Sequence, residues 1–102
     1  MAENPILNFE TFAAQLNTSF RVKPAADLTV ELLLIEANDK SVASQEMFSL
    51  IFQGPSRTFL PQGLYPVEHD RIGVFDLFIV PIGRDEDQYR YEAIFNRVRK
   101  PH

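Results

Sequence analysis

The sequence contains no cysteine. This absence excludes disulfide bonds, thiolate zinc sites and a cysteine nucleophile, and it makes the chain indifferent to the redox state of its compartment. The longest apolar run, residues 32–35, is far shorter than the roughly 20 residues that a membrane-spanning helix needs. The first eight residues lack the basic and apolar regions of a secretory signal peptide. We therefore expect a soluble, cytoplasmic protein with no membrane partner.

Basic side chains are too few for a nucleic-acid-binding protein. The formal net charge is −4 at pH 7, whereas contacts to phosphate groups need a basic face. Basic residues concentrate only at the C-terminus, where Arg97, Arg99 and Lys100 are more typical of a solvated chain end than of a binding site. We expect no nucleic-acid partner.

Apolar residues, by contrast, are plentiful. The chain has 102 residues, of which 45% are hydrophobic and 24% charged, and nine are phenylalanine. These values are those of an ordinary globular protein, and the length suits one hydrophobic core. The sequence predicts a single domain over residues 1–102, without internal repeats or a low-complexity linker.

A short amphipathic helix is predicted near the N-terminus. Asn8 is a favourable N-cap, and Phe9, Phe12, Ala13 and Leu16 follow at helical spacing. A helix of about two turns is marginal by itself, so its apolar side chains must dock onto another element. A sheet is the expected partner.

From Thr18 onward the apolar period changes from 3.6 to 2, which indicates strands. Pro24 and Asp27 are typical of a turn after the first strand. Pro81 indicates an edge position or a β-bulge, because proline cannot donate to a sheet ladder. Six strands are predicted, at residues 20–22, 28–35, 47–53, 64–69, 74–82 and 89–98.

The connections are too short for parallel crossovers, so strands that are neighbours in sequence are expected to pair antiparallel. The predicted fold class is mainly β (α+β): a small antiparallel β-barrel or closed sandwich of about six strands. The helix is expected to plug one end or cover one face. Closure would remove exposed sheet edges.

Four residues are candidates for binding a ligand: Arg57, His69, Arg84 and Asp85. Arg57 and Arg84, with Arg90, could form a small anion-binding edge. The alternative is that these arginines form ordinary surface ion pairs, each worth at most about 1 kcal/mol. The second interpretation is the more frequent one.

A catalytic site is not expected. His69 beside Asp70 could act as a general base, but adjacent strand residues point to opposite faces, which places the pair poorly for a relay. No activated nucleophile accompanies them. The acidic run 85–87 could attract a divalent cation but lacks the EF-hand pattern, and zinc would have only His69 and His102. No metal or other cofactor is predicted.

Aromatic residues could line a cavity for an apolar ligand, although a six-stranded barrel is normally filled by its own side chains. The residues concerned are Phe48, Phe52, Tyr65, Phe75, Phe78, Tyr91 and Phe95. We expect them to form the core.

Several runs resemble a family of uncharacterised bacterial domains. They are FSLIFQGP (48–55), LPQGLY (60–65), EH (68–69), LFIVPIGRD (77–85) and YEAIFN (91–96). The resemblance implies a domain of about this length with an N-terminal helix, sometimes encoded near phage-tail-collar-like proteins. It implies no activity.

The favoured hypothesis is a non-enzymatic structural or protein-interaction module, and the resemblance implies that it is an accessory of a phage-tail-like assembly. It would bind a protein partner, or associate with itself, through a sheet edge. The first alternative is a small-ligand-binding β-barrel, and the second is a hydrolase-type enzyme that uses His69.

Overall fold

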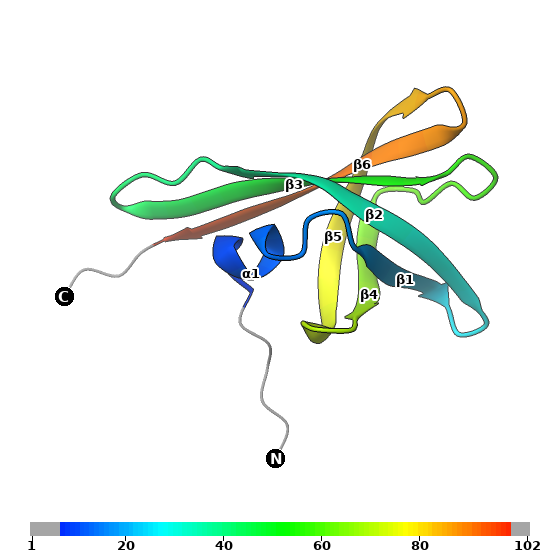
Figure 1. Cartoon of the computed structure of the whole chain (residues 1–102), viewed down its shortest axis with the longest axis horizontal. Coiled ribbons are helices and arrows are strands. Elements are labelled where there is room, and N and C mark those ends of the chain that lie inside the picture. The colour runs from blue at the N-terminus through cyan, green and yellow to red at the C-terminus, as the bar shows by residue number, and fades with distance from the viewer. Residues whose placement is uncertain (1–6, 99–102) are drawn as a thin grey trace, which may run out of the picture.

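The computed structural model describes residues 7–98, in which one short helix precedes six strands (Figure 1). The predicted mainly-β class and the six strands are confirmed. Arg99, Lys100 and His102 lie outside the described residues, among which no helix is long and apolar enough to cross a membrane. The elements are α1 (Phe9–Ala13), β1 (Ser19–Ala25), β2 (Leu28–Asp39), β3 (Gln45–Pro55), β4 (Gly63–His69), β5 (Gly73–Asp85) and β6 (Gln88–Val98).

The helix α1 is shorter than its pattern predicts. Asn8 caps it, since its Oδ1 accepts a hydrogen bond from the Thr11 N–H at 2.8 Å. After α1, Asn17 adopts a left-handed conformation (φ 66°) that turns the chain towards β1. The prediction of two turns is therefore wrong, and Leu16 does not dock but remains 38% exposed. Phe12, which is fully buried, anchors the helix.

Two of the prolines inside strands, Pro24 and Pro81, lie at irregular positions of the sheet. Pro24, which the sequence predicts in a turn, belongs to β1, where the pairing with β2 shifts register between Val22 and Ala25. Pro81 lies in β5 beside a register shift in its pairing with β6, so the predicted bulge is confirmed. A bulge accommodates proline because no regular ladder hydrogen bond is needed there.

The sheet closes as a ring in the order β1-β2-β3-β6-β5-β4, with antiparallel pairing throughout. Most neighbours in sequence pair as expected, but β3 and β4 do not. Besides β2, β3 pairs with β6, along the whole stretch from Gln45↔Val98 to Pro55↔Gln88. The connection between β3 and β4 instead carries the chain to the other side of the ring.

Strand pairing around the ring is incomplete at two seams, β1–β4 and β5–β6. The β1–β4 seam has only the pairs Arg21↔Glu68 and Val22↔Val67. The next position of the same register holds Pro66, which has no N–H to donate. On the other side, β5 pairs with β4 as far as Ile79 and with β6 only from Val80 onward.

Over the residues of β5 that precede Val80, β5 and β6 diverge, and α1 lies on the side where they separate (Figure 1). The ring of Phe12 lies 5.7 Å from that of Phe75 on β5 and 5.2 Å from that of Phe95 on β6. The helix thus closes the interior with an aromatic side chain where the strands cannot. The sequence leaves open whether the helix plugs one end or covers one face; in the structure it covers the gap between β5 and β6 (Figure 1).

Candidate functional site

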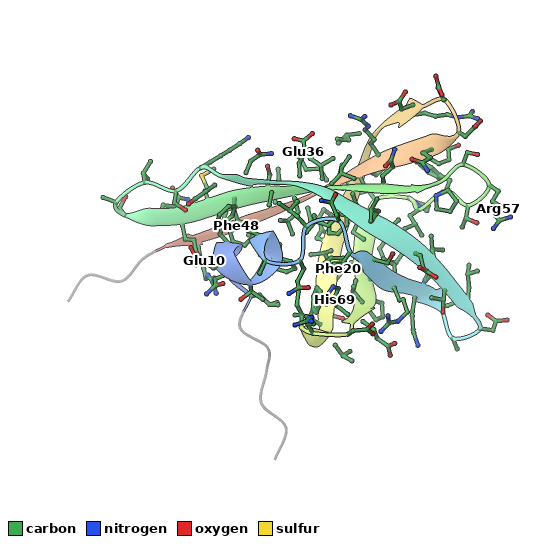
Figure 2. The ribbon with its side chains drawn as sticks, viewed as in Figure 1. Glu10, Phe20, Glu36, Phe48, Arg57 and His69 are labelled. Carbon is green, nitrogen blue, oxygen red and sulfur yellow. The ribbon has the colours of Figure 1, made fainter. Side chains whose placement is uncertain are left out.

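The four predicted ligand-binding residues lie at opposite ends of the barrel. His69 ends β4 and pairs with Gly73 at the start of β5, whereas Arg84 and Asp85 end β5. A strand advances about 3.3 Å per residue, so the length of β5 separates the two groups by roughly 30 Å. Figure 2 shows His69 and Arg57 correspondingly far apart. His69 cannot share a ligand with the other three.

The charged groups at the end of β5 are engaged with one another. The Arg84 guanidinium lies 5.7 Å from the centre of the Tyr89 ring, and its Nε donates to the Glu86 carbonyl at 3.3 Å. Asp85 accepts from Arg90 at 3.1 Å. Arg84 and Asp85 thus stabilise the β5–β6 turn.

An open hollow of about 390 Å³ lies beside that turn, lined by Gln53 and residues 85–88. Three of its five lining residues are acidic, which repels an anion. The exposed Arg57 lies on the β3–β4 connection, which meets the turn through a 3.0 Å hydrogen bond from the Ser56 N–H to the Asp87 carbonyl. No group of His, Asp or Glu within residues 7–98 could hold a metal ion.

His69 is buried at the base of the barrel with both ring nitrogens engaged. Its Nδ1 lies 3.1 Å from the Arg71 N–H nitrogen and 3.3 Å from that of Ile72. Both groups are donors, so Nδ1 is the unprotonated acceptor and the proton resides on Nε2. Nε2 then donates to Thr18 Oγ1 at 2.8 Å, while the Thr18 hydroxyl donates to the Gln15 carbonyl at 2.6 Å. We call this arrangement the His69 clamp.

The surroundings of the clamp keep the imidazole neutral. Burial lowers the pKa of His69, the Asp70 carboxylate opposes that shift, and the charges of Arg21 and Arg71 lower the pKa further. The two N–H groups that face Nδ1 also favour the unprotonated form. The clamp is thus a structural connection between the β4–β5 turn and the segment after α1.

A catalytic role for His69 receives no support from this geometry. Asp70 lies in the turn after β4, is exposed, and binds Arg21 at 3.0 Å instead of orienting the imidazole. The nearest hydroxyl, that of Thr18, donates to a carbonyl. A general base needs a free lone pair within reach of a substrate proton, and neither nitrogen offers one here.

The interior of the barrel is filled by side chains. The ring of Phe20 packs against Phe52 and against His69, at centroid distances of 5.3 and 4.3 Å. The expectation that the aromatic residues form the core holds for most of them but is wrong for Phe78, which is 47% exposed on the outside. Its outward position follows from strand alternation, since Leu77 beside it points inward. The buried apolar residues are Phe12, Phe20, Val22, Val30, Leu32, Leu34, Phe48, Leu50, Phe52, Leu60, Val67, Phe75, Leu77, Ile79, Tyr91 and Ala93.

The outer face of β4 and β5 is apolar along much of its length. Leu64 lies opposite Phe78, and Pro66 lies opposite Asp76. Leu64, Val74 and Phe78 are 64%, 63% and 47% exposed. We call Leu64, Pro66, Val74, Asp76 and Phe78 the outer β4–β5 surface. Large apolar side chains gathered in this way mark interaction sites more often than singly scattered ones do.

A strand edge borders this surface. Residues 73–78 pair with β4 on one side, whereas on the other side, where α1 lies and Phe12 packs against Phe75 (Figure 1), pairing with β6 begins only at Val80. A strand with a single neighbour presents a row of N–H and C=O groups that point away from it. We call residues 73–78 the free edge.

Sequence reasoning finds the apolar character of residues 74–82 but not the free edge. The alternation of Phe75, Leu77 and Ile79 with Val74, Asp76 and Phe78 marks two faces, and it could have identified the three outward residues. Nothing in the sequence tells where β5 exchanges one neighbour for the other, because that depends on the pairing of distant strands.

Residues 7–95 match the family model of a domain of unknown function, DUF6916. No curated protein and no solved structure matches the chain.

Proposed function

Since the chain belongs to the DUF6916 family of domains of unknown function, we propose its function from its geometry: it is a non-enzymatic structural or protein-interaction module that binds a protein partner through a sheet edge. The resemblance of its sequence to domains encoded near phage-tail-collar-like proteins suggests a tail-like assembly, formed in the cytoplasm, as the setting.

The observation that carries the proposal is the free edge beside the outer β4–β5 surface. An extended segment of a partner that adds to the edge obtains main-chain hydrogen bonds, and its side chains gain apolar contacts with Val74 and Phe78. The two features complement each other, because the edge supplies affinity and the side chains supply selectivity. Neither an unpaired strand edge nor a group of exposed apolar side chains would be expected on a face that is always solvated.

The rival functions draw less support from the structure. A hydrolase would need a reactive histidine, and the nitrogens of His69 are engaged in the clamp. A ligand-binding barrel would need interior space, and the interior is packed with aromatic and aliphatic side chains.

Isolation of the native complex with an affinity-tagged chain, followed by chemical cross-linking, tests the proposal. The double variant Leu64→Ser, Phe78→Ser should lose the partner that the unmodified chain retains. Val42→Ser is the matched control, because Val42 is 57% exposed outside this surface. Exposed substitutions of this kind change stability little, and circular dichroism verifies that both variants fold. Equal recovery of the partner by all three chains would contradict the proposal.

A further inference from the structure

We propose that the segment bound by the free edge is a basic amphipathic β-strand, in which a lysine or arginine stands between two apolar residues at alternate positions. This inference rests on the proposed function and specifies the chemistry of the partner. It follows from the register of the edge, from the charge of Asp76 and from the poor fit of a second copy of the chain.

The register of the edge determines what an added strand meets. Val74, Asp76 and Phe78 are the outward residues of residues 73–78, in the order apolar, acidic, apolar. Residues that lie directly opposite each other on neighbouring strands share a face and interact through their side chains. The complementary strand therefore carries apolar, basic and apolar side chains at positions i, i+2 and i+4.

Asp76 is an available carboxylate. It is exposed and has no ion pair among the described residues, whereas Glu68 on the adjacent strand is paired with Arg21 at 3.6 Å and Lys23 at 3.3 Å. Glu92 on β6 has no ion pair within the described part of the chain either. These two carboxylates, Asp76 on the free edge and Glu92 opposite Val80, favour a positively charged partner.

A second copy of the chain fits the edge poorly. In an antiparallel pair of two identical edges, the register that matches Val74 with Phe78 places Asp76 opposite the same residue of the other copy. Like charges directly opposite each other destabilise a sheet. The net charge of −4 on each chain adds to the repulsion. The same carboxylate that discourages self-pairing is therefore the one that selects a basic partner.

The experiment uses two synthetic peptides and the isotope-labelled full-length chain at low ionic strength. The first peptide is Thr-Val-Thr-Lys-Thr-Val-Thr, and the second has Glu in place of Lys. Nuclear magnetic resonance titration should show amide shifts at residues 73–78 with the lysine peptide, and binding of the glutamate peptide should be weaker by about fivefold or more, as expected for one attractive against one repulsive cross-strand pair.

Two variants assign the effect to Asp76. Asp76→Asn should abolish the difference between the peptides. Asp27→Asn, which removes the same charge from the exposed turn between β1 and β2, should leave it unchanged. The salt dependence of lysine-peptide binding should be reduced in the first variant alone.

Three results would overturn the inference, and they separate its failure from that of the proposed function. Equal binding of both peptides at residues 73–78 would contradict the preference for a basic segment but would agree with docking of a partner at the edge. Absence of binding, or binding at other residues, would contradict both the basic segment and docking at the free edge. Dimerisation of the unmodified chain through the same residues, detected by light scattering, replaces the basic partner with a second copy.

Discussion

His69 and Thr18 are 51 residues apart in the sequence, and their side chains meet at 2.8 Å, from Nε2 to Oγ1, at the base of the barrel. The contact joins the last residue of β4 to the segment between α1 and β1. Since Thr18 also donates to the Gln15 carbonyl, the contact ties the segment after α1 to the sheet by hydrogen bonds, and the packing of Phe12 holds the helix itself.

Replacement of Thr18 by valine should lower the free energy of unfolding by about 1–2 kcal/mol. Valine preserves the shape of the side chain but leaves the buried Nε2–H of His69 without an acceptor, and an unsatisfied buried donor carries its full desolvation cost. Urea denaturation measures the effect. Thr29→Val, at an exposed position of β2, is the control and should change stability by less than about 0.5 kcal/mol. An equal loss in both variants would contradict the clamp.

Stability should decrease as the pH falls below about 6.5, the ordinary pKa of histidine. Burial lowers the pKa of His69 in the folded chain. Between that lowered pKa and 6.5 the unfolded chain therefore binds more protons than the folded chain, so the free energy of unfolding rises with pH in this window. The measurement is urea denaturation from pH 5 to 7.5.

The variant His69→Asn isolates this contribution, because it retains an acceptor for the β4–β5 turn and cannot titrate. Its free energy of unfolding should depend less steeply on pH than that of the unmodified chain. The carboxylates and His102 are common to both chains, so their titration does not account for the difference. If the two curves run parallel through the window, His69 is not buried in its neutral form.

Tyr91→Phe should cost about 1–3 kcal/mol of stability. The buried Tyr91 hydroxyl accepts a hydrogen bond from the Leu60 N–H at 3.0 Å and thereby anchors the β3–β4 connection to the barrel interior. Phenylalanine fills the same space but leaves that N–H unsatisfied. Tyr65→Phe, which removes an exposed hydrogen bond to the Pro61 carbonyl, should cost much less. Thermal denaturation of the two variants compares them, and a similar melting temperature would refute the anchor.

Three glycine-to-alanine substitutions should differ in effect. A Cβ on Gly54 would lie 2.5 Å from Leu32 Cδ2, so alanine overpacks the core and should cost about 1–3 kcal/mol. Gly73 has φ +103° in the β4–β5 turn, where alanine is strained and should cost about 1–2 kcal/mol. Gly83 has open space and no such φ, so alanine there should be neutral. Chemical denaturation of all three ranks them, and a large loss at Gly83 would contradict the description.

Local chemistry made several features predictable. An asparagine that precedes a helix accepts a hydrogen bond from one of the free N–H groups of the first turn, so the N-cap at Asn8 could be predicted from the sequence. The bulge at Pro81 follows from a missing N–H. The inward residues Phe48, Leu50 and Phe52 follow from the alternation of strand side chains. Each of these depends on residues close to each other in the chain.

Other features depend on distant residues and could not be predicted. The helix ends early because Asn17 turns the chain so that its N–H binds the Leu34 carbonyl at 2.8 Å, and the helical pattern through Leu16 gives no sign of this. The burial of His69 follows from the closure of the ring, and its tautomer follows from the turn beneath it.

The sequence by itself determined the class of fold, the strand periods and the set of residues available for the core, because a two-residue period and the chemistry of caps and prolines act locally. Tertiary structure alone decided that β3 pairs with β6, that β5 changes neighbours at Val80 and that residues 73–78 are left as an edge. The physical reason is that strand pairing is a competition between surfaces far apart in the chain, and its outcome depends on which arrangement closes the whole core.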